Sequence, residues 1–292
     1  MAAALWARRL GIPFELLEAE SRPGGQLRYI QNEIGDVPGL VSMDSSRLTA
    51  GLIQQVQAGQ LAIHTNQKVA SLHLDQGLLQ TAAQSWHASY FLLATGASMR
   101  RLQIPGEKEM IARGEQYSTS RGAERFRGKE VVVVGGGDRA FEGAWRLAEA
   151  GARVTLVHRS KQFRARTQLR RWIVQHPGIR ILTEMQVKRI LGESRVEGVE
   201  IEDAHGGRCF LRAEAVFTRI GIQPNSELVA GKVDLDEDGY VIVDRWGRTS
   251  HPRLYAAGDV CTPASHASLA ASFGQAVMAV KSILLQLEAG CQ

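Results

Sequence analysis

The sequence predicts an α/β protein with two nucleotide-binding, three-layer domains of the Rossmann type, one inserted into the other. Its central part reads as a buried strand, a glycine-rich turn, a helix and a second strand. On either side of this unit, an apolar strand at 90–96 ends in Thr-Gly and another at 254–259 ends in Gly-Asp. Alternating strands and helices are typical of parallel sheets covered by helices. At 292 residues the chain is long enough for two compact domains.

The composition narrows the class of protein. A chain with 44% hydrophobic and 22% charged residues is neither collagen-like nor disordered. Its three cysteines lie far apart and predict no disulfide framework and no Cys-x-x-Cys metal or redox site. The net charge of +5 comes from scattered basic residues and predicts no nucleic-acid partner. Because no apolar stretch approaches a membrane span and the start lacks a signal-peptide core, we expect a cytoplasmic protein with no membrane partner.

The central unit carries the first nucleotide site. Residues 130–134 are a continuous β-branched run, which is typical of a strand buried on both faces of a parallel sheet. A helical pattern follows over 141–148 and stops at Gly151, and a second strand follows at 153–157. The turn between strand and helix has the G-x-G-x-x-A form, whose glycines let backbone N–H groups approach a pyrophosphate at the helix N-terminus. We expect the cofactor to contact Gly135, Gly136, Gly137, Asp138, Arg139 and Ala140.

The end of the second strand predicts which dinucleotide binds. In an NAD-binding unit this strand ends in an acidic residue that contacts the ribose 2′-hydroxyl. Here it ends in His158 and Arg159, and further cations follow at 161, 164 and 166. Cations hold a 2′-phosphate through charge-assisted hydrogen bonds, whereas a carboxylate repels it. The sequence therefore predicts NADPH, held by His158, Arg159 and Arg164; the alternative is a solvated basic loop.

The remaining segments complete two sheets. Residues 179–182 read as a further parallel strand, and alternating runs between 187 and 212 with a turn at Gly206 read as an antiparallel excursion. Residues 215–220 close the inserted domain, and 221–225 look like its exit linker. On the flanks, 14–18 is a strand ending in Glu18, and a helix runs from 269 to 287. The strand that ends in Asp259 places a carboxylate where it can accept hydrogen bonds from a polyol.

Taken in order, these motifs resemble the low-molecular-weight thioredoxin reductase family, which includes thioredoxin-reductase-like ferredoxin–NADP reductases. The resemblance covers the whole chain and rests on a series of motifs. It implies a split FAD domain, an inserted NADPH domain and a homodimer. The predicted parts are residues 1–114 and 225–292 for FAD and 115–224 for NADPH. The motifs are Glu18, Gly24-Gly25-Gln26-Leu27, Ala94-Thr95-Gly96, Ile104-Pro105-Gly106-Glu107, the nucleotide unit and Ala256-Ala257-Gly258-Asp259.

The resemblance also implies roles for residues of the FAD domain. Glu18 would bind the adenosine ribose, Gln26 and its neighbours would line the flavin, and Asp259 would contact the ribityl chain. Val69 would hold the adenine through its backbone. The other residues carried over to the FAD site are Gly24, Gly25, Leu27, Asp36, Thr95, Gly96, Gly258, Gln275 and Ala276.

One departure concerns the electron acceptor. Thioredoxin reductases carry a redox Cys-x-x-Cys before the second nucleotide unit, and the corresponding positions here are Ser118 and Arg121. A serine cannot form the disulfide, so we expect no thioredoxin reduction by that route. The ferredoxin-reductase branch also lacks the pair, and residues 36–40 and 272–276 resemble that branch. The chain ends soon after the last helix, without the long extension of many ferredoxin reductases, which leaves the acceptor open.

The second departure is at the front. Residues 1–10 resemble the tail of the family's first helix, with Gly11 as its stop, so the preceding strand and the glycine loop for the FAD pyrophosphate are absent. That strand is central in a doubly wound sheet, and unsatisfied backbone groups would cost about 1–3 kcal/mol each. One hypothesis is that the natural protein starts upstream of Met1. The other is that the short form is real and has lost tight FAD binding; we favour the first.

The sequence as a whole predicts an NADPH-dependent FAD flavoprotein oxidoreductase. Because flavin and nicotinamide carry the chemistry, we name no catalytic residue and no metal ligand. The expected partner is a small electron carrier such as ferredoxin. Two alternatives stay open: a disulfide reductase that acts without its own Cys-x-x-Cys, and a non-catalytic NADPH-binding or regulatory protein that has lost FAD.

Overall fold

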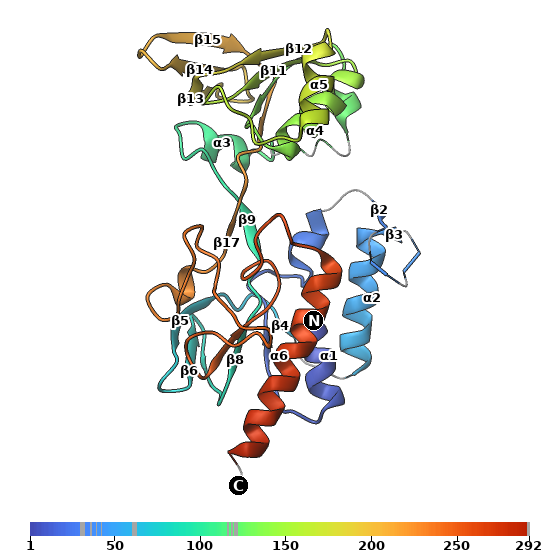
Figure 1. The fold of residues 1–292 in the computed structure, drawn as a ribbon, viewed down its shortest axis with the longest axis vertical. Coiled ribbons are helices and arrows are strands. Elements are labelled where there is room, and N and C mark those ends of the chain that lie inside the picture. Colours follow the sequence, from blue (N-terminus) through green and yellow to red (C-terminus); the bar gives the residue numbers. More distant parts are fainter. Residues whose placement is uncertain are drawn as a thin grey trace. The chain divides into compact units, whose positions relative to one another are not determined.

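The computed structural model describes residues 1–29, 33–35, 37–38, 40–41, 43–59, 63–115, 117, 119 and 122–290. The chain divides into two compact units, which we call the flanking unit, residues 1–98 and 223–292, and the inserted unit, residues 99–222 (Figure 1). The predicted mixed α/β fold, with one unit interrupting the other, is confirmed. The inserted unit begins at Met99, earlier than the predicted residue 115. The reason is α3 (Glu107–Ala112), whose Met110 is buried against the inserted unit's strands.

A four-stranded parallel sheet forms the centre of the inserted unit. It consists of β10 (Glu130–Val134), β11 (Arg153–Val157), β12 (Ile179–Leu182) and β16 (Ala215–Thr218), in the order β12-β11-β10-β16. The first three strands have the bounds that the sequence predicts, and the fourth ends two residues earlier than predicted. The order places β10 between β11 and β16, so the glycine turn that follows β10 has neighbouring strand ends on both sides.

The valines of β10 explain why its sequence is apolar throughout. Val131 and Val133 pack with Phe141 and Leu147 of α4 (Asp138–Glu149). The next strand positions, Val132 and Val134, face the other way. They join a second core with side chains of an antiparallel sheet: Val187, Ile190, Val199 and Ile201. The strand is therefore buried on both faces, as predicted.

Helices and strands cover opposite faces of this parallel sheet. α4 and α5 (Thr167–Gln175) lie side by side on one face (Figure 1). The antiparallel sheet contains β13 (Met185–Leu191), β14 (Gly198–Asp203) and β15 (Arg208–Arg212), which confirms the predicted excursion. Its last turn contains Gly206 at φ +84°, a conformation that favours glycine. A short 3₁₀-helix, Ala123–Phe126, precedes β10.

The flanking unit is built from short strand pairs. β1 (Leu16–Leu17) pairs in parallel with β4 (Ile63–His64), and β8 (Phe91–Leu93) pairs in parallel with β18 (Leu254–Ala256). β1 and β8 are both shorter than the predicted strands 14–18 and 90–96. The other pairings are β2 (Glu33–Ile34) with β3 (Met43–Asp44), the antiparallel sheet of β5 (Val69–His73), β6 (Leu78–Thr81) and β7 (Ser85–His87), and β9 (Ala97–Met99) with β17 (Ile222–Pro224).

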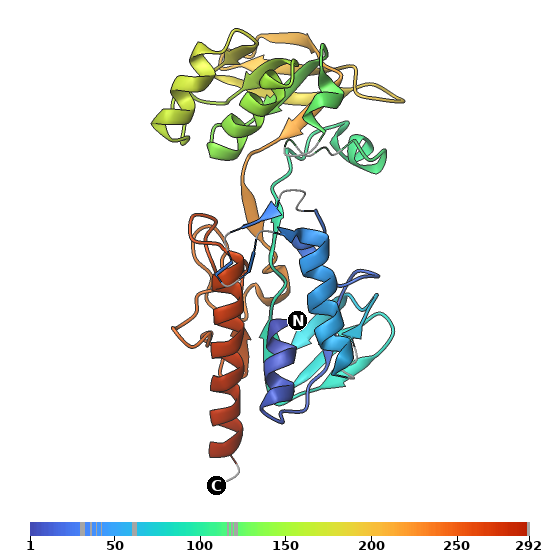
Figure 2. The same cartoon turned by 90° about the vertical axis from the view of Figure 1, so that its right-hand side faces the viewer.

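Three helices complete the flanking unit. α1 (Ala2–Arg9) lies between α2 (Ser45–Ala58) and α6 (Leu269–Ala289), as Figures 1 and 2 show. α1 ends before Gly11, which has φ +69°, as the sequence predicts for a helix stop. Side chains cap the other two helices, since Asp44 accepts from Ser46 N–H and Ser268 accepts from Ala271 N–H. Two 3₁₀-helices, Gly25–Tyr29 and Glu227–Val229, also belong to this unit.

Helix α6 corrects one expectation about apolar stretches. Its 21 residues are long and apolar enough to cross a membrane by length and composition, whereas the sequence predicts no stretch near that length. The same test is passed by core helices of water-soluble proteins. Ala279 and Val280 of α6 are buried, and Arg248 Nε donates a hydrogen bond to Ser282 Oγ. These contacts tie α6 into the flanking unit.

Candidate nucleotide-binding sites

The glycine turn of the inserted unit is closely surrounded at two of its three glycines. A methyl group added at Gly135 would collide with the backbone oxygen of Arg219, and one added at Gly136 would collide with the His158 ring. Gly135 also has φ +149°, which side-chain-bearing residues rarely adopt. At Gly137 the same methyl group would meet nothing within 4 Å. The turn is therefore fixed from behind and open at its third glycine, which fits a backbone that a phosphate group approaches.

The N-terminus of α4 offers unpaired donors at the same place. Gly137 is the N-cap residue, and no side chain caps the helix. The first N–H groups of a helix lack intrahelical partners and carry a partial positive charge. An uncapped helix start beside an open glycine is suited to bind phosphate oxygens.

The loop after β11 folds back onto the glycine turn. The backbone N–H groups of Arg164 and Ala165 both donate to the Gly136 carbonyl, at 2.9 and 3.1 Å. The His158 ring is held by its Nε2, which lies 3.0 Å from the Gln162 oxygen, and it stacks near the Phe163 ring at 5.1 Å between centroids. The structure thus brings His158 and Arg164 together with the glycines, as the sequence predicts.

Ion pairs sort the cations of this loop into two groups. Arg166 pairs with Asp138 at 2.7 Å and with Glu142 at 3.1 Å, and Lys161 pairs with Glu184 at 3.4 Å. In the part of the chain that the structure describes, Arg159 and Arg164 are exposed and have no carboxylate partner. The two arginines that the sequence assigns to the 2′-phosphate are therefore the two that keep their charge available.

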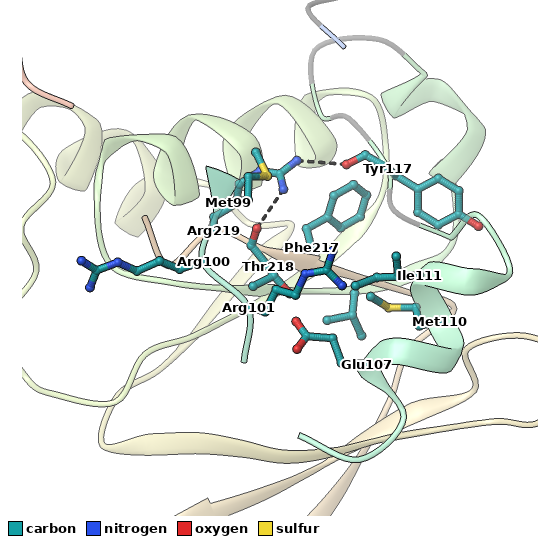
Figure 3. A pocket seen from close by; sticks show the side chains of 11 residues that line it. Met99, Arg100, Arg101, Glu107, Met110, Ile111, Tyr117, Phe217, Thr218 and Arg219 are labelled. Carbon is teal, nitrogen blue, oxygen red and sulfur yellow. Dashed lines mark hydrogen bonds between the residues drawn. The ribbon is translucent and has the colours of Figure 1, made fainter. Parts of the chain in front are cut away.

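A small cavity lies at the end of β16 in the same unit (Figure 3). Its volume of about 20 Å³ is enough for one water molecule. It lies beside the buried Thr218 hydroxyl, for which the described residues supply no hydrogen-bond partner. Buried Glu107 also lines it, and its carboxylate accepts from the N–H groups of Leu102 and Gln103 at 3.0 and 2.7 Å. Glu107, which the sequence associates with a family motif, thus holds a turn in place.

In the flanking unit, Gln26 joins three of the predicted segments. Its side-chain nitrogen donates to Ala97 O at 2.8 Å and to Asp259 Oδ2 at 3.0 Å. Gly24, just before it, has φ +127°, and a methyl group there would lie 2.7 Å from Thr49. The predicted flavin-contacting turn and the predicted ribityl-contacting carboxylate are therefore neighbours. An amide and a carboxylate together suit a ligand that carries hydroxyl groups.

The turn after β8 has a partner in the segment that the sequence predicts to be a linker. Thr95 Oγ1 donates to Asn225 O at 2.6 Å, and Asn225 Nδ2 donates back to Thr95 O at 2.8 Å. Ser98 Oγ also donates to Asn225 Oδ1 at 2.7 Å, and the Asn225 N–H donates to Gly96 O. Asn225 thus fixes the Thr95-Gly96 turn. No local signal could have revealed a partner 130 residues away.

The Gly258-Asp259 turn is held by Gln275 of α6. The oxygen of Gln275 accepts from the Gly258 N–H at 2.8 Å, and its nitrogen donates to Thr262 Oγ1 at 2.8 Å. Ala276 next to it is buried. Cys261 lies in the same turn, and burial raises the pKa of its thiol to about 11. At neutral pH this thiol stays protonated, so it is neither a nucleophile nor a metal ligand.

Other predicted residues lie apart from these clusters or outside the described residues. Glu18 follows β1, where its carboxylate accepts from the Glu20 N–H at 3.0 Å, and Val69 opens β5. Leu27 is buried in a core next to α2. Asp36, Ser118 and Arg121 lie outside the described residues. Among the described residues, no cluster of His, Cys, Asp and Glu could hold a metal ion.

Comparisons with known proteins identify the relatives of this arrangement. Residues 1–282 match the pyridine nucleotide-disulphide oxidoreductase family. Over 291 residues the chain is 29% identical to a thioredoxin reductase of Peptoclostridium litorale, covering 97% of this chain and 92% of that one. It is 33% identical to a polypeptide of the alkyl hydroperoxide reductase of Pseudomonas putida, covering 89% of this chain and 51% of that polypeptide. The chain thus spans about half the length of this second relative.

Solved structures agree with the sequence relatives. The thioredoxin reductase of Lactococcus lactis in its FR conformation superposes with a TM-score of 0.79 at 27% identity, covering 97% of this chain and 94% of that one. The thioredoxin reductase of T. acidophilum gives 0.76 at 28% identity, covering 98% and 94%.

Proposed function

Because the chain belongs to the pyridine nucleotide-disulphide oxidoreductase family, we propose that it is an NADPH-dependent flavoprotein that passes electrons through FAD to a small redox carrier. Its thioredoxin-reductase-like relatives are FAD-containing, NADPH-dependent oxidoreductases. NADPH would supply a hydride, and FAD would accept two electrons and can release them singly. The observation that carries the proposal is the open glycine turn with two unpaired arginines beside it.

The inserted unit would hold NADPH. The pyrophosphate would lie against Gly137 and the uncapped start of α4, where nothing obstructs the backbone. The 2′-phosphate would lie against Arg159 and Arg164, the exposed cations that no described carboxylate neutralises. His158, fixed over Gly136, would line the same position. These residues fit an adenine dinucleotide that carries a 2′-phosphate.

The flanking unit would hold FAD. Glu18 at the end of β1 would accept a hydrogen bond from the adenosine ribose, and Asp259 would accept from the ribityl hydroxyls. Gln26, already bonded to Asp259, would orient that carboxylate and line the flavin. The turns at Gly96 and Gly258, both with positive φ, would let backbone approach the ligand. This chain's own residues therefore bind and orient, while the transferred electrons belong to the cofactors.

The proposed acceptor is a one-electron carrier such as ferredoxin. Thioredoxin reductases among the relatives argue for a small redox protein as partner. At the positions corresponding to their Cys-x-x-Cys, this sequence has Ser118 and Arg121. Without a disulfide there, electrons would leave the flavin directly, and a one-electron carrier suits that route. The inserted unit's positive charge would attract an acidic carrier.

The test of the electron path uses the full chain incubated with FAD and freed of excess flavin. We expect a yellow protein whose flavin absorbance is bleached when NADPH is added under anaerobic conditions. The matched control is Gly136→Val, whose side chain would occupy the place of the His158 ring. This variant should keep its flavin and fail to bleach.

Two results would contradict the proposal. A colourless protein that binds NADPH but cannot be loaded with FAD would support the regulatory alternative. A yellow protein that NADPH leaves unbleached would show that no electrons pass. The acceptor is tested separately with the loaded protein: NADPH-driven reduction of ferredoxin supports the assignment, and reduction of thioredoxin alone would favour a disulfide reductase.

A further inference from the structure

Two arginines lie on the β16 side of the glycine turn, away from the predicted 2′-phosphate position. The sheet order places β11 on one side of β10 and β16 on the other. Arg159 and Arg164 follow β11, whereas Arg219 follows β16. The backbone oxygen of Arg219 is so close to Gly135 that a methyl group there would collide with it. Arg219 therefore adjoins the glycine turn from the opposite side.

The Arg219 guanidinium is fixed, but only by neutral groups. Its two terminal nitrogens donate to Thr218 O at 2.9 Å and to Tyr117 O at 3.0 Å (Figure 3). The group lies 5.9 Å from the centre of the Phe217 ring. A guanidinium has five N–H groups, and these bonds use two of them. No carboxylate of the described residues forms an ion pair with it. The group is positioned, charged and still able to donate.

Arg139 supplies a second unneutralised charge nearby. It lies in the first turn of α4, is exposed, and forms no ion pair or hydrogen bond with the described residues. A cation in the first turn opposes the helix dipole. The acid of the same turn, Asp138, is occupied by the Arg166 side chain and backbone N–H. Burial, and secondarily the charge of Arg139, lower the pKa of the Arg219 guanidinium.

Two cations and a helix N-terminus thus meet without an anion among the described residues. Such an arrangement opposes folding unless a ligand compensates it. We infer that Arg139 and Arg219 form a second anion-binding position that holds the pyrophosphate of the dinucleotide, separate from the 2′-phosphate position of Arg159 and Arg164. The inference rests on the proposed NADPH binding and adds the residues that grip the half of the ligand common to NADPH and NADH.

The two positions predict opposite patterns of ligand selectivity. A pyrophosphate contact serves NADPH and NADH alike, but not adenosine 2′-monophosphate, which has no pyrophosphate. A 2′-phosphate contact serves NADPH and adenosine 2′-monophosphate, but not NADH. Removing one charge-assisted hydrogen bond weakens binding by about tenfold or more.

The experiment measures dissociation constants of the full chain for NADPH, NADH and adenosine 2′-monophosphate by calorimetry. Arg139→Ser should weaken NADPH and NADH by about tenfold each and leave adenosine 2′-monophosphate unchanged. Arg146→Ser, which removes an exposed arginine from the last turn of the same helix, is the matched control and should change none of the three. Arg219→Gln should repeat the Arg139→Ser pattern.

Three outcomes would overturn the inference. If wild-type protein binds NADPH and Arg139→Ser binds both dinucleotides equally well, the pyrophosphate position does not involve this arginine. If all three ligands weaken together, the effect is one of general charge. If the wild type binds none of the three, the proposed function fails as well, so the two failures are distinguishable. Arg139 lies exposed on the surface, so its substitution tests the inference even if Arg219→Gln does not fold.

Discussion

The two units end their second strands with opposite charges. In the flanking unit β1 is followed by Glu18, and in the inserted unit β11 is followed by His158 and Arg159. This position contacts the adenosine ribose in dinucleotide-binding folds. A carboxylate there suits a free 2′-hydroxyl, and a cation suits a 2′-phosphate. The difference teaches that one layout can select two adenine dinucleotides through the charge at a single strand end.

The same contrast extends to each unit as a whole. The inserted unit has 24 Lys and Arg against 15 Asp and Glu, a net charge of +9, and the flanking unit has 11 against 15, a net charge of −4. The overall net charge of +5 conceals this division. Charge concentrated in one unit raises the local concentration of anionic ligands there. The inserted unit is therefore the one suited to the more highly charged cofactor.

The largest expected effect tests the rigidity of the inserted unit's turn. Gly135→Val should lower the free energy of unfolding by about 3 kcal/mol or more, because the side chain would collide with Arg219 backbone at a positive φ. Gly137→Ala, at a position with free space and extended backbone, should cost less than about 1 kcal/mol. Thermal unfolding measures both. Equal losses for the two variants would mean that the turn is not packed as described.

A charge reversal in the flanking unit should have the next largest effect. Glu18→Lys replaces the acceptor proposed for the ribose and should weaken FAD binding by about tenfold or more while leaving NADPH binding unchanged. Flavin fluorescence during titration with FAD measures the first, and calorimetry the second. Glu20→Lys, an exposed neighbour, is the control. Parallel loss of both cofactors would blur the division between the units.

A smaller effect is expected where Asn225 holds the Thr95-Gly96 turn. Asn225→Ala removes the side-chain bonds to Thr95 and Ser98 and should lower the free energy of unfolding by about 1 kcal/mol. Ser98→Ala removes one of these bonds and should cost less. Chemical denaturation of the two variants measures the difference. If Asn225→Ala were neutral, the turn would be held by other groups.

The smallest effect concerns the two cysteines with described positions. Because burial raises the pKa of Cys261 to about 11, its thiolate is scarce at pH 8 and accumulates only as the pH approaches 11. Iodoacetamide should therefore label exposed Cys209 before Cys261, as followed by mass spectrometry of peptides. The labelling rate of Cys261 should rise with pH. Rapid labelling of Cys261 at pH 7 would contradict its burial.

The sequence predicts the inserted unit better than the flanking one. Strands such as β10 and β11 consist of continuous apolar residues, because both faces of their sheet are buried, and their bounds are predicted without error. β1 pairs along only two residues with β4, so the apolar run around it overstates its length. The β5-β6-β7 sheet escaped prediction, since its residues alternate weakly and its turns lack a strong signal.

The site residues divide in the same way. Local motifs such as Gly135–Gly137 and the strand-end cations can be found in sequence because their chemistry depends on neighbours along the chain. Contacts across the fold cannot. Asn225 meets Thr95 from 130 residues away, and Arg166 meets Asp138 from 28 residues away. Sequence alone therefore counted Arg166 among the free cations, whereas its ion pair removes it from that group.

The most direct test of the central claim compares affinities for NADPH and NADH in the wild type and in Arg164→Glu. If the inserted unit selects its cofactor by the charge at its strand end, the wild type binds NADPH more tightly, by about tenfold or more. The variant should lose most of that preference, because a carboxylate repels the 2′-phosphate, while NADH affinity changes little. Equal weakening of both nucleotides would contradict the assignment.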